Sequence, residues 1–342
     1  MNDSQKKLLD LLQSSFPLSP RPFEPLAAAL NAQLIDFAPL TEDELVKEVS
    51  RLKEDGLLRR IGPFFSAVHL GYTSTLIAAR VLEDVCDHII AEVNAHPGVS
   101  HNYGRDHKFN IWFTLTVSSS EHIEQFIEHL RQKYQLPAIF SLPALKMFKL
   151  DARFSLSVDH PGATASLRKC KSNACASKPL AEVTLSQEQI ELIRQLQNGL
   201  DIIPEPFHKI AQQAGWDVTA ALDQIKQWLA SGLIRRFGAA VRHHRAGFAA
   251  NGMVVFELSP EQIESAGEHL ASLPHVTHCY QRPTAHDWPY NLFAMTHAHD
   301  QPELNMMVEN MVRQIRPRRY DILLTTAEYK KQPVKFFQET AK

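Results

Sequence analysis

The sequence predicts an α+β protein that is a tandem duplication of one unit. A polar motif occurs twice with identical spacing, and its members are Pro97, Val99, His101, Tyr103 and Arg105, then Pro274, Val276, His278, Tyr280 and Arg282. A second block, Gly-Leu-Leu-Arg-Arg-Ile-Gly at residues 56–62, has the counterpart Gly-Leu-Ile-Arg-Arg-Phe-Gly at residues 232–238. Both blocks fall in the same order in each half, so each half is one complete unit.

Each half begins with a small helical domain. Apolar residues recur at helical spacing over residues 5–13 and 41–55, and residues 59–72 then read as a short hairpin or wing. The helices expected in the second half are 185–196, 207–214 and 218–231. This outline is that of a winged helix-turn-helix domain.

The periodicity of each half then changes to a mixture of strands and helices. In the first half we expect strand 74–82, helix 84–96, strands 99–105 and 110–117, helix 120–134 and strand 143–150. In the second half the same series is 251–258, 260–273, 276–282, 290–296, 302–315 and 320–325. The order β-α-β-β-α-β is the ferredoxin-like arrangement.

These patterns divide the chain into five parts. They are a winged-helix domain at 1–72, a ferredoxin-like domain at 73–153, a linker at 154–184, a second winged-helix domain at 185–249 and a second ferredoxin-like domain at 250–342. The linker is rich in Ser, Ala and Lys. Cys170 and Cys175 lie in it, close enough to suggest a metal site, but a plain linker is the simpler interpretation.

Composition favours an ordinary soluble protein. The chain has 342 residues, of which 44% are hydrophobic and 22% charged, with a net charge of -2. Residues 1–6 lack the apolar core of a signal peptide, and no apolar run approaches the ~20 residues that span a bilayer. We therefore expect a cytoplasmic protein that does not associate with membranes.

A winged helix followed by a ferredoxin-like domain resembles the Lrp/AsnC family, whose members bind DNA with the first module and pair through the second. A recognition helix needs basic and amide side chains on its exposed face. The charged residues of helix 41–55 are instead Glu42, Asp43, Glu44, Lys47, Glu48, Arg51, Lys53, Glu54 and Asp55, and Lys226 is the one basic residue of 217–231. DNA is therefore not an expected partner, although a transcription regulator remains the alternative class.

The polar motif is the expected place for chemistry. Alternate side chains of a strand share a face, so Val99, His101, Tyr103 and Arg105 should project together, as should their counterparts. Arg grips carboxylates, His exchanges protons near neutral pH, and Tyr donates hydrogen bonds. Such a stripe suits a polycarboxylate whose carbanion or ring must be protonated. A solvent-facing sheet edge is the alternative, and duplication would preserve an idle pattern as faithfully as a useful one.

The second half adds two further polar clusters. Arg242-His243-His244-Arg245 follows the wing, and His286-Asp287-Trp288 lies in an insertion that the first half lacks. Two basic clusters near an aromatic ring could frame a large, flat, multiply anionic ligand, or the first could be a solvated basic turn. At the positions of residues 242–244 the first half has Ser66, Ala67 and Val68, so we expect the main site in the second half.

Longer motifs identify a closer resemblance. Arg-Arg-Phe-Gly-Ala at 235–239 followed by Arg242-His243, and His-Cys-Tyr-Gln-Arg-Pro at 278–283 followed by Trp-Pro-Tyr-Asn-Leu-Phe at 288–293, resemble siroheme decarboxylase. The first half, with its own motifs at 59–63 and 101–105, is similar to the partner subunit of that family. A fused chain of this kind resembles the form found in haem d1 biosynthesis, while separate subunits serve the alternative haem pathway.

The resemblance implies a lyase that decarboxylates siroheme without oxidation. Two acetate side chains would become methyl groups, giving didecarboxysiroheme. It implies no cofactor and no metal of its own beyond the iron of the substrate, in keeping with the absence of a dinucleotide or P-loop fingerprint. Expected partners are siroheme, the two halves pairing as an internal pseudo-dimer, and either further homologous subunits or a second copy of the chain. A tetrapyrrole-binding module without catalysis is the alternative.

The candidate catalytic residues are His278, His243, Tyr280, His101 and Tyr103. The candidate substrate-binding residues are Arg242, Arg282, Arg105, His244, Arg245, His286, Trp288, Asn291, His107 and Asn110. The hypothesis is that Arg242 and Arg282 hold carboxylates while His278 or His243 protonates the carbon. One of His278, His243 and His101 would ligate the siroheme iron. His297 and His299 are second-tier candidates, and the first half would hold a second pocket, contribute across the interface or stabilise its partner.

Overall fold

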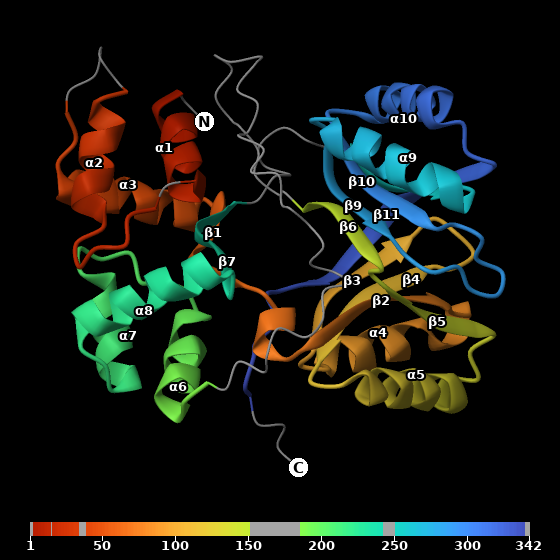
Figure 1. The fold of residues 1–342 in the computed structure, drawn as a ribbon, viewed down its shortest axis with the longest axis horizontal. Coiled ribbons are helices and arrows are strands. Elements are labelled where there is room, and N and C mark those ends of the chain that lie inside the picture. The colour runs from red at the N-terminus through yellow and green to blue at the C-terminus, as the bar shows by residue number, and fades with distance from the viewer. Residues whose placement is uncertain (1–2, 15, 34–38, 151–184, 242–249, 339–342) are drawn as a thin grey trace.

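The chain folds into two lobes, one helical and one built on a large sheet (Figure 1). The computed structural model describes residues 3–14, 16–33, 39–150, 185–241 and 250–338. Both halves of the sequence contribute to both lobes, because the helix-turn-helix parts associate with one another and the ferredoxin-like parts do the same. Over the described ranges no helix is both long and apolar enough to cross a bilayer.

The helical lobe contains three helices from each half. They are α1 Asp3–Ser14, α2 Phe23–Asn31 and α3 Glu42–Glu54, then α6 Gln187–Leu196, α7 Pro206–Ala214 and α8 Val218–Ser231. Thr41 starts α3 through a capping box with Glu44, and Ser186 starts α6 in the same way with Gln189. Their buried apolar faces form one core shared by the two halves.

The two wings join this lobe into one body. Strand β1, Leu58–Phe65, pairs antiparallel with β7, Ile234–Val241, with Gly62 opposite Gly238. The expectation of a hairpin within residues 59–72 is therefore wrong, because β1 is a single strand and the short 3-10 helix η1, Val68–Leu70, follows it. Each half supplies one strand, and the partner strand comes from the other half.

The second lobe is one nine-stranded antiparallel sheet. The first half contributes β2 Thr73–Arg80, β3 Val99–Arg105, β4 Ile111–Val117, β5 Ala138–Pro143 and β6 Lys146–Leu150. The second half contributes β8 Ala250–Glu257, β9 Val276–Gln281, β10 Leu292–Ala298 and β11 Arg319–Lys331. The spatial order is β5-β2-β4-β3-β11-β8-β10-β9-β6, which contains two ferredoxin-like sets of four strands side by side.

The last strand of each half passes into the sheet of the other half. Residues 319–324 of β11 pair with β8 and residues 325–331 continue along β3. In the first half β5 pairs with β2, and after Ala144 and Leu145 the chain continues as β6 beside β9. Since β5 and β6 are the two edges of the sheet and only two residues separate them, the edges lie close together and the sheet curls.

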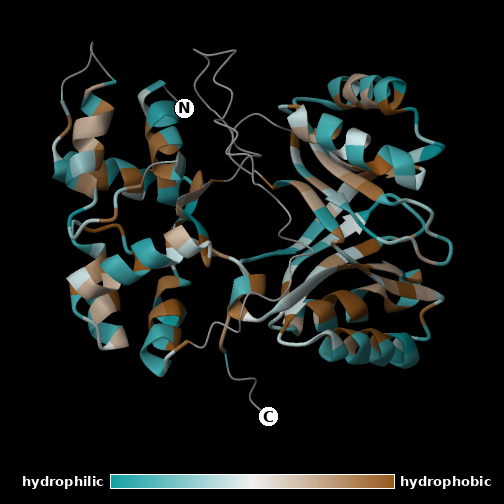
Figure 2. Cartoon of the chain, viewed as in Figure 1, coloured by the Kyte–Doolittle hydropathy of each residue, from teal (hydrophilic) through white to brown (hydrophobic). Residues whose placement is uncertain are grey.

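Helices cover the outer face of this sheet. Helices α4 Cys86–Ala95, preceded by η2 Glu83–Val85, and α5 Ser120–Tyr134 pack on the first set of strands, and α9 Pro260–Ser272 and α10 Gln301–Ile315 pack on the second set. Their apolar sides turn toward the strands (Figure 2). At Gly267 of α9 any side chain would clash with the Phe148 ring of the exchanged strand β6, with the nearest atom 2.4 Å from a Cβ. The glycine thus permits the close fit of the first half's strand under the second half's helix.

The inner face of the curled sheet holds a separate apolar core made by both halves. It consists of Ala78, Phe109, Trp112, Leu142, Val255, Trp288, Phe293 and Leu323. Trp288 is 1% exposed and lies 5.1 Å from Trp112 and 5.7 Å from Phe109, ring centre to ring centre. The insertion of the second half therefore closes the contact between the halves with an aromatic side chain.

We expect Trp288→Ala to destabilise the chain by about 3–5 kcal/mol, because it leaves a cavity among rings from both halves. Urea unfolding followed by circular dichroism measures the change. Trp216→Ala is the matched control: this ring is only half-buried in the helical lobe, so a smaller loss is expected there. Equal losses at the two positions would contradict the assignment of Trp288 to the core between the halves.

Candidate functional site

The polar motif forms a stripe of side chains along the inner face of each half's sheet. The His101 and Tyr103 rings stack 6.1 Å apart, and the Arg105 guanidinium lies 5.2 Å from the Tyr103 ring centre. In the second half the His278 and Tyr280 rings are 6.4 Å apart, and Arg282 lies 5.0 Å from the Tyr280 ring. The three polar positions share a face in both copies, as strand alternation predicts.

The expectation that Val99 projects with the stripe is wrong. A register shift between Val99 and His101 inserts Ser100 into β3 as a bulge, and Thr277 occupies the same place in β9. The extra residue reverses the alternation, so Val99 and Val276 point into the cores under the helices. The bulge therefore turns the imidazoles away from the helices.

The bulge residue also holds each imidazole in place. The Ser100 hydroxyl lies 2.9 Å from Nδ1 of His101, and the Thr277 hydroxyl lies 2.9 Å from Nδ1 of His278. Both hydroxyl residues are buried, at 5% and 2% exposure. A hydrogen bond at Nδ1 fixes the ring orientation and leaves chemistry to the Nε2 side. The sequence signal for this pair is a hydroxyl residue directly before each motif histidine, and it was overlooked.

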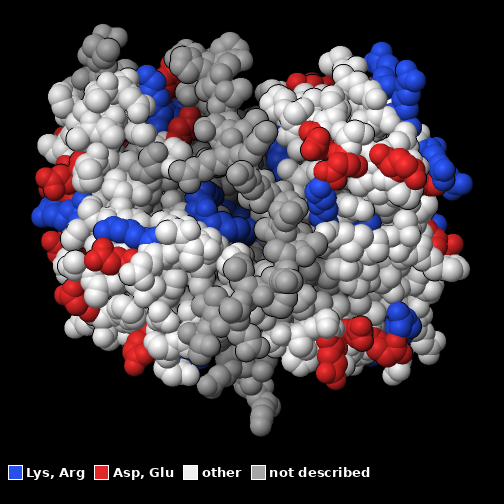
Figure 3. Space-filling model, in the orientation of Figure 1, with Lys and Arg blue, Asp and Glu red and all other residues white. Residues whose placement is uncertain are grey.

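Two arginines from the two-stranded sheet approach the stripes. Arg59 of β1 donates to the carbonyl of Lys331, the residue that pairs with His101, at 3.3 Å. Desolvation lowers the pKa of Arg235 of β7 and the charge of Tyr280 raises it, so the two groups lie within electrostatic range of each other. Figure 3 shows Lys and Arg side chains gathered where the helical lobe faces the sheet lobe. The sequence shows both arginine pairs, at 59–60 and 235–236, but it does not show that the pairing of β1 with β7 brings one arginine of each pair toward a stripe.

The second arginine of each pair has a structural role. Arg60 donates to the carbonyl of Pro63 at 3.1 Å, and Arg236 donates to that of Ala239 at 3.1 Å. Both bonds span three residues of their own strand. Alternation along β1 and β7 thus separates one arginine that approaches the stripe from one that stabilises the strand.

Burial and neighbouring charges set the protonation of the first-half stripe. Burial, with the Lys331 and Arg59 charges, lowers the pKa of His101 to about 4. Burial, with the Glu328 carboxylate, raises the pKa of Tyr103 to about 12, and burial lowers the pKa of Arg105 to about 10. At neutral pH the stripe therefore presents a neutral imidazole, a neutral phenol and a charged guanidinium.

The strands beside the two stripes differ in charge. Residues that pair directly across strands place their side chains on the same face. In the first half Glu328 is opposite Tyr103 and Lys331 opposite His101. In the second half the corresponding positions are Met147 opposite Tyr280 and Leu150 opposite His278. The second stripe thus has an apolar flank where the first has charges.

Arg105 and Arg282, both expected to bind substrate, contact the opposite half. Arg105 is 7% exposed and donates to the Leu323 carbonyl at 3.1 Å and to the Thr325 hydroxyl at 2.6 Å. Arg282 donates to the Leu142 carbonyl. Arg105 thereby binds β11 of the second half and Arg282 binds β5 of the first half, so these two residues tie the halves together.

Asn110 and Asn291 are also structural. The Asn110 side chain accepts from the Val81 amide at 2.9 Å and donates to the Val81 carbonyl at 3.0 Å. Asn291 makes the same two bonds with Leu258, at 3.0 and 2.8 Å. An amide paired in both directions with backbone has little left for a ligand, so these residues join strand ends in both halves.

The remaining predicted residues of the described chain lie at a different place. His107 and Trp288 line a cavity of about 550 Å³ together with Thr284 and Tyr290, and no residue of either stripe lines it. The His286 side chain is 97% exposed beside Asp287. The insertion thus builds a cavity of its own and does not extend the stripe. Its His107 is desolvated, which lowers the pKa of that imidazole.

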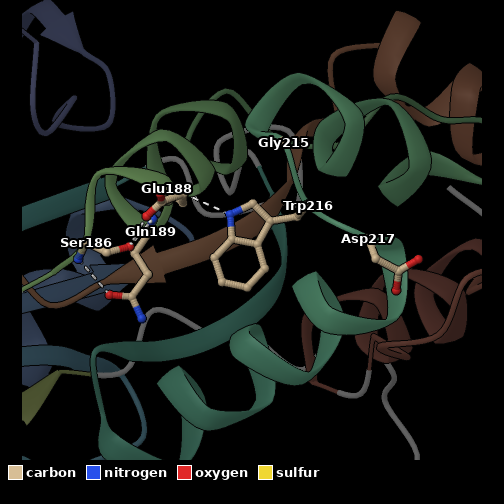
Figure 4. A pocket seen from close by; sticks show the side chains of 6 residues that line it. All are labelled: Ser186, Glu188, Gln189, Gly215, Trp216 and Asp217. Atoms are coloured by element: carbon tan, nitrogen blue, oxygen red, sulfur yellow. Dashed lines mark hydrogen bonds between the residues drawn. The ribbon is translucent and has the colours of Figure 1, made fainter.

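Another cavity, about 470 Å³ in volume, lies in the helical lobe. It is lined by Ser186, Glu188, Gln189, Gly215, Trp216 and Asp217. The Trp216 indole donates to the Glu188 carbonyl at 3.1 Å, and Ser186 and Gln189 form the helix cap (Figure 4). None of the candidate residues from the sequence lines it.

Some predicted residues cannot be placed against the stripes. Arg242, His243, His244 and Arg245 lie outside the described residues, as do Cys170 and Cys175. Over the described ranges no three His, Cys, Asp or Glu side chains group as metal ligands. Of the second-tier candidates, His297 bonds the Thr277 hydroxyl at 3.0 Å, whereas His299 pairs with Glu303 at the surface.

The comparisons with known proteins agree with this architecture. A sequence model described as AsnC-like ligand binding domain matches residues 69–149 and 245–330, and one described as siroheme decarboxylase NirDL-like HTH domain matches residues 5–59 and 189–235. The chain is thus a tandem pair of helix-turn-helix and AsnC-like modules. It is 31% identical to siroheme decarboxylase from Hydrogenobacter thermophilus, over 99% of this chain and 96% of the relative. The chain belongs to the siroheme decarboxylase family.

Two further matches bear on its organisation. The crystal structure of the siroheme decarboxylase NirDL in co-complex with an iron-uroporphyrin III analogue matches with a TM-score of 0.71 and 29% identity, over 99% of this chain and 95% of that one. The siroheme decarboxylase alpha subunit of Desulfovibrio desulfuricans is 42% identical over 46% of this chain and 87% of its own length. One chain here therefore spans two units that occur separately in some relatives.

The low pKa of His101 predicts a pH dependence of stability. Its value is about 4 in the folded chain against an ordinary 6.5, so between these values the unfolded chain binds more protons and stability falls as the pH falls. The contribution of His101 to the free energy of unfolding falls by about 2 kcal/mol between pH 7.5 and pH 5. We expect His101→Gln to lose less stability than the parent over this range, measured by urea unfolding at both pH values. His286→Gln, at an exposed position, should keep the parent's pH dependence; an identical slope in all three proteins would contradict the assignment.

Proposed function

We propose that this chain is a siroheme decarboxylase, a carboxy-lyase that converts two acetate side chains of siroheme to methyl groups. One observation carries the proposal: each half places an imidazole and a phenol on one face, near an arginine of the two-stranded sheet. A relative matched along nearly its whole length bears the name siroheme decarboxylase. The stripes supply the groups that an anionic, proton-consuming reaction needs.

The reaction we propose is heterolytic. The bond between the acetate CH2 carbon and its carboxylate breaks, carbon dioxide leaves, and the electron pair remains on the CH2 carbon next to the macrocycle. A proton from an imidazole then completes the methyl group. No electron enters or leaves, so we propose that no redox cofactor is required. The iron is part of the substrate.

Binding would rest on Arg59 and Arg235. A guanidinium offers a planar fork of donors to carboxylates, and siroheme carries many carboxylates. The expected clamp was Arg242 with Arg282, and because Arg282 donates to the Leu142 carbonyl of the opposite half, we assign its share of the clamp to the arginines of β1 and β7. The expected clamp residue Arg242 and the acid candidate His243 lie outside the described residues and remain predictions.

We place the reacting acetate at the second stripe. Loss of a charged carboxylate as neutral carbon dioxide is easier where water is excluded, and Met147 and Leu150 give that stripe an apolar flank. His278 is the proposed proton donor, with Tyr280 as a neutral hydrogen-bond donor. In the first half His101 is neutral at pH 7, so it offers a lone pair, which an iron ligand must have, and little acidity.

The two halves would replace two subunits. A separate alpha subunit in Desulfovibrio desulfuricans matches 46% of this chain, and here one polypeptide carries two such units, whose exchanged strands pair through backbone hydrogen bonds. We therefore propose that the chain alone is competent as an internal pseudo-dimer.

The test is anaerobic incubation of the purified chain with siroheme, followed by liquid chromatography and mass spectrometry. Loss of two carboxyl groups is the expected result. Tight binding with no loss would overturn the proposal in favour of a tetrapyrrole-binding module, and absence of binding would overturn the siroheme assignment itself.

Arg59→Ala and Arg235→Ala should each raise the siroheme Kd by roughly 10-fold to 100-fold, because a hydrogen bond to a charged group contributes about 1.5–3 kcal/mol. Titration of tetrapyrrole absorbance measures this change. Lys209→Ala removes an exposed charge from the same lobe and serves as the control, with an unchanged Kd. Unchanged affinity in both arginine variants would refute the clamp.

A further inference from the structure

A hydrogen-bonded chain leads from the second stripe to a second histidine next to it. The Thr277 hydroxyl lies 2.9 Å from Nδ1 of His278 and 3.0 Å from Nε2 of His297. Thr277 is 2% exposed, while His297 is half-buried near the end of β10. One buried hydroxyl thus connects two imidazoles on neighbouring strands.

Local structure builds this connection. The bulge at Thr277 lies between the pairs Met295–His278 and Thr296–Val276, so the hydroxyl is turned toward the next residue of β10, His297. The amide of His297 donates to the carbonyl of His275 at 3.1 Å, just beyond the last pair of β10 with β9, and His297 stays paired with Asn251 of β8. The connection therefore depends on the backbone of two strands and not on a flexible loop.

The first half has the same start and no continuation. Ser100 holds Nδ1 of His101 at 2.9 Å, as Thr277 holds His278. The position that corresponds to His297 is Thr116, whose hydroxyl donates to Ser74 at 2.9 Å. Among the described residues, the one side-chain partner of the Ser100 hydroxyl is His101. The second half thus has a second imidazole next to its stripe, and the first half has none at the corresponding position.

The geometry points to a proton relay from His297 through Thr277 to His278, which protonates Nδ1 of His278 as its Nε2 gives a proton to the substrate. This inference rests on the proposed decarboxylation. A hydroxyl carries one hydrogen, so Thr277 donates to one ring while it accepts from the other. A neutral imidazole that gives away its Nε2 proton would become an anion. A proton that reaches Nδ1 in the same step keeps the ring neutral, so the relay makes His278 a competent acid.

The proposed step is balanced in protons and electrons. Nε2 of His278 gives its proton to the carbon that carries the electron pair left by carbon dioxide, and a C–H bond forms. The Thr277 hydroxyl proton passes to Nδ1 of His278, and the Nε2 proton of His297 passes to the Thr277 oxygen. His297 begins as an imidazolium and ends neutral, His278 ends with its proton on Nδ1, and exchange with water restores both rings before the next decarboxylation. Thr277 and His297 are positioning residues, because they act through His278.

The test uses the full chain with siroheme under anaerobic conditions and measures both decarboxylation products with time. Thr277→Val removes the hydroxyl at nearly constant volume, and His297→Gln keeps an N–H donor that does not titrate. We expect each variant to bind siroheme with the parent's Kd and to slow both decarboxylations roughly 100-fold.

Conservative and matched variants separate a relay from a structural role. Thr277→Ser restores the hydroxyl and should recover most of the rate that Thr277→Val loses. His297→Ala should regain part of its rate when imidazole is added. Thr116→Val alters the corresponding position of the first half and should leave both steps unchanged. If Thr277→Val does not fold, His297→Gln and His297→Ala, at a half-buried position, provide the test.

If Thr277→Val and His297→Gln both decarboxylate siroheme at the parent's rate, the relay is overturned and the decarboxylase proposal stays intact. A parent chain that binds siroheme and removes no carboxyl group would instead overturn the decarboxylase proposal. The two failures are therefore distinguishable in one experiment.

Discussion

The exchange of last strands between the two halves is the constraint on which the rest of the structure depends. Because β11 continues from β8 to β3, and β6 continues the first half's chain beside β9, neither stripe is built by one half alone. Arg105 and Arg282 bind carbonyls of the opposite half where the exchanged strands pass. Two guanidinium groups that are desolvated and bonded in this way make separation of the halves costly, since each would lose its buried partners.

This pairing also explains where the helical lobe must sit. The chain leaves β11 toward α6, where Phe336 enters the helical core and the Gln197 side chain bonds its backbone in both directions, at 3.2 and 2.7 Å. The strands β1 and β7 pair across the halves and bring Arg59 and Arg235 to the stripes. The helical lobe thereby brings these arginines toward the stripes, while its α3 carries more acidic than basic residues.

Much of the fold was predictable because it is local. Helical periodicity, caps such as Thr41 and the order of strands and helices all follow from short stretches of chain. The strand exchange and the pairing of β1 with β7 were not predictable, since both are contacts between residues far apart in sequence. The bulge at Ser100 and Thr277 was missed because alternation assumes regular pairing, and it reversed the assignment of Val99. Asn110, Asn291 and Arg105 were taken for ligand contacts because motif positions alone do not show that backbone groups already occupy them.

The differences between the halves argue for a division of work. Both stripes keep the hydroxyl–imidazole pair and the stacked phenol, so duplication preserved the geometry that orients a histidine. Around this common part, the first half carries Glu328 and Lys331 where the second carries Met147 and Leu150. A carboxylate loses carbon dioxide more readily beside apolar side chains than beside charges, and His297 is connected to the imidazole of that stripe through Thr277. Apolar flank and second imidazole occur together in one half, which is the arrangement expected if that half does the chemistry.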